Sequence, residues 1–151
     1  MKVLIVCSGN SDRISPFIQD QAESLEKKGV TIDYFPIRGH GVLGYLKNLS
    51  ILKKHINSCK PDLIHAHYGL SGLLATMQRK KKVVITFHGS DINDTVIRYL
   101  SWLSHIRAAC SIFVSKKLAK KINATDSFTI PCGVDINIFS PIDKTAAKKR
   151  I

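Results

Sequence analysis

The 151-residue sequence lacks an apolar run long enough to cross a membrane. Its first apolar segment follows Lys2 and stops at Cys7. This segment is shorter than the apolar part of a secretory signal and favours a first β-strand. We therefore expect a cytoplasmic protein.

Cysteine is scarce, and its spacing argues against the common cysteine-based sites. The four cysteines are Cys7, Cys59, Cys110 and Cys132, and no C-x-x-C or C-x-x-H pair occurs. Reduced thiols without structural zinc are expected. We predict no metal and no other cofactor.

Acidic residues are few. The sequence has 11 Asp plus Glu against 23 Lys plus Arg, a net charge of +12. Such an excess implies an acidic partner, either nucleic acid, an anionic membrane or a phosphorylated small molecule. Aromatic residues make up only 7% of the chain and do not interleave with the basic clusters, so no nucleic acid is expected.

The basic residues gather in three clusters, within 79–82, 116–121 and 148–150. A solvated surface explains any one of them. In the second cluster we also predict peripheral contact with anionic lipid at the inner membrane face, because a lysine near such a surface is attracted to it. The lysines concerned are Lys116, Lys117, Lys120 and Lys121.

Strand-like and helix-like segments alternate along the chain. Strands are predicted at 2–7, 30–34, 63–67, 83–87, 110–114 and 128–130, with Pro36 ending the second, and helices at 16–29, 46–56, 71–77, 96–107 and 115–122. A chain of this length buries about 68 to 70% of its unfolded surface, which is enough for one core. The predicted fold class is α/β, a Rossmann-like three-layer domain with a mostly parallel sheet.

Polar residues follow the β-branched, apolar strand at 83–87. They are His88, Gly89, Ser90 and Asp91. Ligands of open α/β sheets bind at the carboxyl ends of the strands, so a functional site is expected here. The alternative is structural: His88 is a satisfied core histidine, and Asp91 helps to cap the next helix.

Right-handed crossovers bring the ends of the first, third and fourth strands to one edge of the sheet. Ser8, Gly9, His67 and His88 are therefore expected to face one cleft. The helices that begin after Ser71 and Asp94 would add backbone N–H groups and positive dipole ends. These features suit an anionic or polyhydroxylated ligand.

Residues 39–44 match the dinucleotide fingerprint G-x-G-x-x-G, but their context differs from it. The fingerprint belongs in the first strand-to-helix turn, with an acidic residue about 20 positions later at the end of the next strand. Here the match follows the second strand, and Asp62 precedes the third. We interpret the segment as a loop that lets backbone approach a ligand, or as a flexible entry to a helix.

Several segments, in this order and at this spacing, resemble the N-terminal domain of retaining, nucleotide-sugar-dependent glycosyltransferases of family 4. They are the loop at 8–13 with Pro16 and Phe17, residues 62–67, residues 86–91, Val114 with Ser115, and residues 130–135 with Phe139 and Pro141. The resemblance covers residues 1–141 and implies one half of a GT-B fold, in which two Rossmann-like domains face each other. Residues 142–151 would start the interdomain linker or form a disordered basic tail.

The resemblance also implies roles for individual residues. His88 would be catalytic and point at the transferred sugar, and His67 would support His88 or the acceptor. The substrate-binding set would comprise Ser8, Gly9, Asn10, Arg13, Gly39, Gly41, His67, Tyr68, Gly89, Ser90 and Asp91. Cys132 stands where an asparagine is common in the family.

The implied function is transfer of a sugar from a nucleoside diphosphate sugar to a glycan or lipid-linked acceptor in cell-surface polysaccharide or lipid-glycan biosynthesis. The donor would be held mainly by a C-terminal domain that this sequence does not contain, so the chain alone is expected to be inactive. The alternative is a non-catalytic Rossmann-like module for an anionic or carbohydrate ligand. Metal-dependent hydrolysis by His65, His67, His88 and Asp91 is disfavoured, because no further ligand with metal spacing appears.

Overall fold

Six parallel strands form the centre of the molecule, as the computed structural model shows for residues 1–11, 13–136, 141 and 148. The strands are β1 (Lys2–Ser8), β2 (Thr31–Ile37), β3 (Leu63–His67), β4 (Val83–Phe87), β5 (Cys110–Phe113) and β6 (Ser127–Thr129). They lie in the order β2-β1-β3-β4-β5-β6, with each neighbouring pair parallel. The predicted α/β class is confirmed, and the sheet that was predicted to be mostly parallel is parallel throughout.

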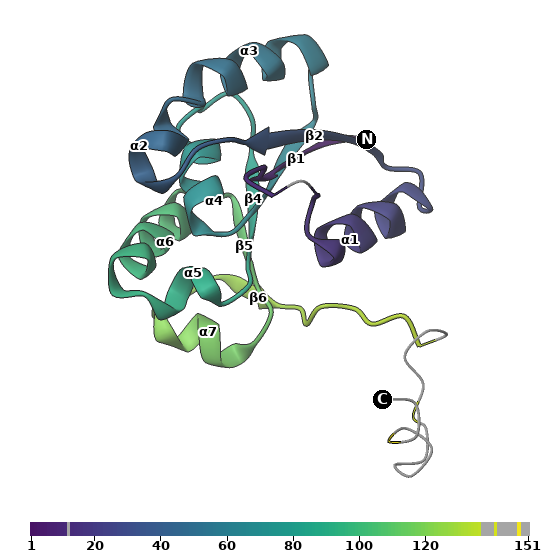
Figure 1. Ribbon diagram of the computed structural model, residues 1–151, viewed down its shortest axis with the longest axis vertical. Coiled ribbons are helices and arrows are strands. Elements are labelled where there is room, and N and C mark those ends of the chain that lie inside the picture. Colours follow the sequence, from purple (N-terminus) through teal and green to yellow (C-terminus); the bar gives the residue numbers. More distant parts are fainter. Residues whose placement is uncertain (12, 137–140, 142–147, 149–151) are drawn as a thin grey trace.

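Helices lie on both faces of this sheet (Figure 1). They are α1 (Pro16–Glu26), α2 (Gly41–Leu46), α3 (Leu49–Cys59), α4 (Gly69–Thr76), α5 (Ser90–Asn93), α6 (Thr95–Arg107) and α7 (Lys116–Lys121). Helix α1 covers one face, and the remaining described helices lie on the other. The chain moves outward from β1 to β2 and then the opposite way across the sheet. Right-handed crossovers therefore place α1 opposite the later helices, in the predicted three layers.

Alternating side chains of the strands supply two hydrophobic cores. Leu4 of β1 lies in the larger core, between the sheet and the layer that includes α3 and α4. Its neighbour Ile5 packs with Ile18 of α1 in the smaller one. Because Ile5 is paired in register with His65 and side chains alternate along a strand, His65 and His67 lie on the α1 face. His65 and His67 therefore belong to a buried strand in the middle of the sheet.

Pro36 lies inside β2 and does not end the strand, contrary to the prediction. The strand continues to Ile37, and Pro36 is paired in register with Cys7. Strand β2 is an edge strand with a neighbour on one side only. A proline is tolerated there because every second residue of an edge strand directs its N–H position away from the sheet.

Helix α6 is buried through small residues and not through all of its large apolar ones. Val96 is 67% exposed, whereas Ser101 and Ser104 are fully buried. The reason is a close approach of α6 to α4, since a Cβ atom on Gly69 would collide with the side chain of Ser101. Small residues at a helix contact let the two backbones come this close.

Three further differences concern element boundaries. The expected helix at 46–56 begins later, as α3, and the glycine-rich segment at 39–44, interpreted as a loop or as an entry to a helix, contributes most of the separate helix α2. The short helix α5 was not predicted, and α4 begins at Gly69 instead of after Ser71. The proposed linker or tail lies, apart from Lys148, outside the described residues, as does Phe139. Within the described part of the chain, no helix combines the length and the apolar character needed to span a membrane.

Candidate functional site

Three strand ends carry the residues around which the site is built. Ser8 ends β1, His67 ends β3, and His88 follows β4 directly. Strand β3 lies between the other two, and the chain reverses its direction across the sheet between β1 and β3. The strand ends therefore converge as the sequence predicted, beside the switch point where open α/β sheets bind ligands.

His65, His67 and His88 form a continuous group, which we call the histidine stack. The rings of His65 and His67 stack with centroids 4.5 Å apart, and those of His67 and His88 stack at 5.4 Å. His65 Nε2 lies 2.8 Å from the hydroxyl of Thr86, and His67 Nδ1 lies 3.1 Å from His88 Nε2. Each ring is thus held by a polar contact as well as by packing.

Burial keeps the histidine stack uncharged. It lowers the pKa of His65 to about 4 and that of His88 to about 4. The pKa of His67 is lowered to about 2, by burial first and then by its neighbours His65 and His88. All three imidazoles are consequently neutral at pH 7, and each carries a single N–H.

The position of the His88 proton follows from its contact with His67. Nε2 of His67 is buried and has no hydrogen-bond partner in the described part of the chain. Buried donors without a partner are rarer than buried acceptors without one, so we assign the His67 proton to Nδ1, where it is donated to His88 Nε2. His88 then carries its own proton on Nδ1, the nitrogen on the far side of the ring from His67.

Two aromatic residues pack on the His88 ring. The ring of Phe17, at the start of α1, lies 4.5 Å from it, and that of Tyr68 lies 4.9 Å from it, centroid to centroid. Tyr68 adopts φ 71° and ψ 154°, a conformation that bulky residues rarely adopt and that marks strain at a functional turn. The turn after β3 therefore holds Tyr68 against His88 at a conformational cost.

Asp91 connects the turns that follow β3 and β4. One carboxylate oxygen accepts the N–H of Gly69 and the other accepts the N–H of Gly89, both at 2.9 Å. Burial raises the pKa of the Asp91 carboxyl, while these backbone hydrogen bonds act in the opposite direction. Gly89 has φ 114°, where a side chain would be strained. Both oxygens of Asp91 are thus already engaged by the protein.

The loop after β1 is fixed to the loop after β2 through one asparagine. The Asn10 amide donates to the carbonyl oxygen of Gly39 and accepts the Gly39 N–H, both at 2.8 Å. The structure therefore brings together two loops from which the family resemblance drew substrate-binding residues, among them Asn10 and Gly39. Arg13 is exposed and lines a different hollow, beside α1, while Gly41 and Ser90 are exposed at the starts of α2 and α5.

Sequence reasoning gave no site role to three residues that contact the site. Phe17 packs on His88, and Thr86 hydrogen-bonds His65. Cys132, in the segment after β6, has its sulfur 4.0 Å from Nδ1 of His88. Only Phe17 had a usable signal, since a large aromatic in the first turn of α1, directly after the site loop, is placed to reach the strand ends.

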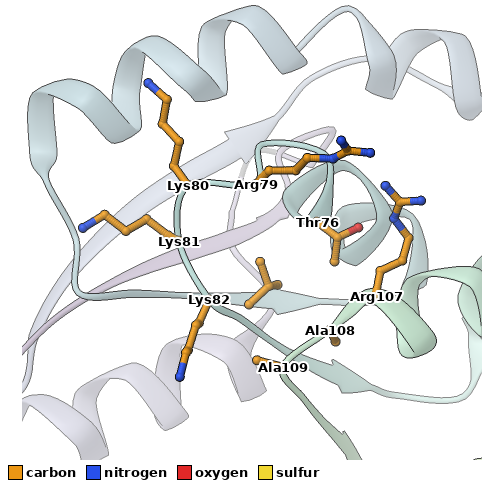
Figure 2. Close-up of a pocket in the computed structure, with 9 residues that line it drawn as sticks. Thr76, Arg79, Lys80, Lys81, Lys82, Arg107, Ala108 and Ala109 are labelled. Carbon is orange, nitrogen blue, oxygen red and sulfur yellow. The ribbon is translucent and has the colours of Figure 1, made fainter.

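A separate basic hollow lies at the amino ends of the strands, away from the histidine stack (Figure 2). It has a volume of about 600 Å³ and lies at the residues just before β4 and β5. Its cationic lining consists of Arg79, Lys80, Lys81, Lys82 and Arg107. Because His88 follows the carboxyl end of β4, the hollow and the histidine stack are on opposite edges of the sheet.

Comparisons with known proteins agree with this architecture. The sequence profile of Glycosyltransferase Family 4 matches residues 2–138. A Bacillus subtilis (strain 168) protein named as a teichuronic acid biosynthesis glycosyltransferase, TuaC, is 34% identical over an alignment of 104 positions. This alignment covers 60% of this chain and 26% of TuaC.

Two solved structures share the fold. Sucrose-phosphate synthase from Thermosynechococcus elongatus matches 99% of this chain with a TM-score of 0.77 and 16% identity. UDP-N-acetylglucosamine 2-epimerase from Rickettsia bellii matches 85% with a TM-score of 0.60 and 11% identity. The chain spans about half the length of these structures, 52% and 44%. At such low identity the likeness concerns the fold, one half of a GT-B arrangement, and not the reaction.

Proposed function

Because this chain belongs to Glycosyltransferase Family 4, we propose that it is the acceptor-side half of a retaining enzyme that transfers a sugar from a nucleoside diphosphate sugar. The acceptor is a glycan or a lipid-linked glycan of cell-surface biosynthesis, a class to which the name of TuaC also points. The observation that carries the proposal is the neutral His88, held by His67, Phe17 and Tyr68 at the carboxyl edge of the sheet.

A neutral His88 suits the chemistry of glycosyl transfer. As the bond to the departing diphosphate breaks, positive charge develops on the sugar ring. A protonated imidazole would oppose that charge, whereas a neutral one offers a hydrogen bond without doing so. With its proton on Nδ1, His88 donates to a hydroxyl of the transferred sugar and holds the ring in place for reaction.

The residues around His88 then have distinct tasks. His67 fixes the tautomer of His88, and Phe17 and Tyr68 exclude water from its ring faces. Asp91 holds the two turns that flank the histidine. The loops joined by the hydrogen bonds between Asn10 and Gly39 shape the acceptor side.

The positively charged helix α7 supplies a membrane-facing surface beside this site. Leu118 of α7 lies within 3.5 Å of the position that a Cβ on Gly89 would take, so α7 adjoins the turn after His88. Lys116, Lys117 and Lys120 are exposed, whereas Leu118 packs toward the core. Anionic lipid held at α7 would bring a lipid-linked acceptor close to the carboxyl edge of the sheet.

A chimaera tests the proposal. The chain replaces the part of TuaC that it matches. Release of nucleoside diphosphate by this chimaera is followed with a panel of nucleoside diphosphate sugars and bacterial lipid-linked glycans. We expect release that requires both a donor and an acceptor. The alternative, a non-catalytic module, predicts that a folded chimaera binds glycans but releases no nucleoside diphosphate with any member of the panel.

A further inference from the structure

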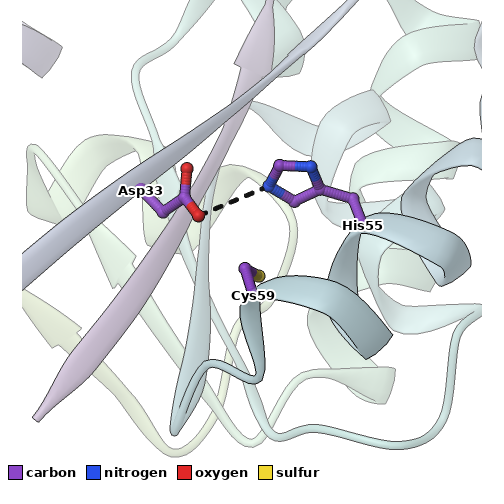
Figure 3. A group of neighbouring side chains, drawn as sticks. All are labelled: Asp33, His55 and Cys59. Carbon is purple, nitrogen blue, oxygen red and sulfur yellow. Dashed lines mark ion pairs between the residues drawn. The ribbon is translucent and has the colours of Figure 1, made fainter.

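A second cluster of chemically reactive side chains lies between β2 and α3 (Figure 3). It consists of Asp33 on β2 with His55 and Cys59 on α3, and one ligand atom from each lies within 4.8 Å of the other two. Nε2 of His55 lies 3.5 Å from a carboxylate oxygen of Asp33. All three residues are half-buried. The cluster takes no part in the site at the carboxyl edge of the sheet.

Asp33 occupies a position where an apolar residue would be expected. It is paired in register with Leu4, a fully buried member of the larger core. Phe35 and Ile37, two and four residues further along β2, point the same way and are buried. A carboxylate on the helix-facing side of a strand breaks the local apolar pattern, and such departures are expected at functional sites.

His55 and Cys59 are one helical turn apart, so their side chains lie on the same face of α3. The His55 ring packs against Phe35 with centroids 5.6 Å apart, which limits its rotation. Its Nε2 atom is shielded from solvent and makes no hydrogen bond with any described residue. A shielded nitrogen that points at a carboxylate and lacks a hydrogen bond is an available metal ligand.

We propose that Asp33, His55 and Cys59 form a binding site for a divalent transition-metal ion, with Zn²⁺ as the best match. Sulfur, imidazole nitrogen and carboxylate oxygen are the three donor types that Zn²⁺ takes, and soft thiolate excludes Mg²⁺ and Ca²⁺. With three protein ligands the fourth tetrahedral position belongs to water. On binding, the Cys59 thiol loses its proton to solvent and the thiolate bonds the metal.

The three ligand atoms need to move only a short distance to coordinate a metal ion. Metal–ligand bonds of about 2.0 to 2.3 Å place neighbouring ligand atoms of a tetrahedron about 3.3 to 3.8 Å apart. The Asp33–His55 pair, at 3.5 Å, already has this spacing. The Cys59 sulfur lies within 4.8 Å of the other two ligand atoms, so it has to approach them by at most about 1.5 Å. A rotation of the Cys59 side chain, in the last turn of α3, can supply this movement.

Lys2 competes with the metal for Asp33. Its ammonium nitrogen lies 3.5 Å from the same carboxylate oxygen that faces His55. A bound dication would displace this ammonium and would join the edge strand β2 to α3. The inferred role is therefore a structural link at the edge of the domain, independent of sugar transfer.

Titration of the reduced 151-residue chain with Co²⁺, followed by displacement with Zn²⁺, tests the site. We expect one Co²⁺ per chain, a thiolate-to-metal charge-transfer band and the visible bands of tetrahedral cobalt. Cys59→Ser should abolish the charge-transfer band, and Asp33→Asn or His55→Ala should weaken Zn²⁺ binding about tenfold or more. Lys2→Gln should tighten binding severalfold.

Cys110→Ser is the matched control, because Cys110 is also half-buried but lies on β5, outside the cluster. It should leave the cobalt spectrum and the affinity unchanged. Circular dichroism of each variant establishes that it is folded. The proposal is overturned if the folded wild type binds no Co²⁺ or Zn²⁺, or if folded Cys59→Ser retains the charge-transfer band of the wild type.

Discussion

His67 donates a hydrogen bond from Nδ1 to Nε2 of His88 across 3.1 Å, and the two rings stack nearly parallel, at 19°. Two neutral imidazoles in this geometry behave as one unit, because the proton position on the first fixes that on the second. Protonation of either ring places positive charge beside the other in a buried setting. The histidine pair therefore has consequences both for stability and for the proposed reaction.

The histidine stack should make the domain acid-sensitive. Burial lowers the pKa of His65 and His67 from 6.5 to about 4 and about 2, so below pH 6.5 the unfolded chain binds protons that the folded chain does not. Stability is complete above this pH and should fall toward pH 4, by about 1.4 kcal/mol per pH unit for each histidine. Urea unfolding at several pH values measures the slope. A folded His67→Gln variant with the slope of the wild type would contradict this assignment.

His88→Ala should impair transfer without unfolding the domain. In the chimaera with a donor-binding half, the turnover number should fall about a hundredfold, because the lost contact acts on the reacting sugar. His105→Ala is the control, since His105 is also half-buried but bonds Ser111 on β5. A lower melting temperature with unchanged turnover per folded molecule would show instead that His88 is structural.

Asp91→Asn should destabilise the fold, because one backbone N–H group that Asp91 binds would lose its hydrogen bond. The asparagine amide offers one acceptor oxygen where the carboxylate offers two, so the N–H of Gly69 or of Gly89 loses its partner. We expect a loss of about 2 to 3 kcal/mol in the free energy of unfolding. Asp94→Asn is the control: Asp94 caps α6 with one oxygen, and asparagine caps equally well, so its effect should stay within about 0.5 kcal/mol. Equal effects of the two substitutions would refute the bridging role of Asp91.

Gly69→Ala should separate α4 from α6. The new methyl group would overlap Ser101, which is fully buried, and overpacking of this kind costs about 1 to 3 kcal/mol. Gly133→Ala is a suitable control because no atom of the described residues lies within 4 Å of the added carbon. Thermal unfolding compares the two. A melting temperature of Gly69→Ala at or above that of Gly133→Ala would show that the helices have room to adjust.

Binding to anionic vesicles should depend on α7 and on salt. Each lysine near such a surface contributes about 1 kcal/mol, and the attraction fades over about 8 Å at physiological salt. Replacing the four lysines of α7 by glutamine should abolish co-sedimentation with anionic vesicles at low salt. The same replacement of residues 79–82, which lie at the opposite sheet edge, should weaken it much less. Binding that is equal for neutral and anionic vesicles would remove the membrane role.

The fold class was predictable because the sequence signals that determine its strands and helices are local. Apolar runs such as Val83–Phe87 and helix signals such as Ser15 before Pro16 act within a few residues, and the alternation of strands and helices then leaves few topologies. Features that depend on contacts between distant parts of the chain were not predicted. Gly69 lets α6 approach α4 closely, so Ser101 lies in the core and Val96 does not.

The site was likewise predictable where it follows from the fold class, and not where it depends on individual contacts. Parallel topology alone brings His67 and His88 to one edge, so both were predicted together. Their hydrogen bond, the strained backbone at Tyr68 and the approach of Cys132 depend on three-dimensional geometry that no sequence motif encodes. The cluster of Asp33 with His55 and Cys59 was also missed. His55 and Cys59 are one helical turn apart, but Asp33 comes from a different element, β2, and only the fold brings it to them.

Pro36 affects how the domain meets other copies of itself. Thr31 and Ile37 direct their backbone groups toward β1, where they bond Met1 and Gly9, so Pro36, at an alternate position, directs its nitrogen to the open edge of β2. A strand from another molecule would find no donor there. Pro36 thus disfavours the addition of a foreign strand at the β2 edge, a route to the aggregation of open sheets.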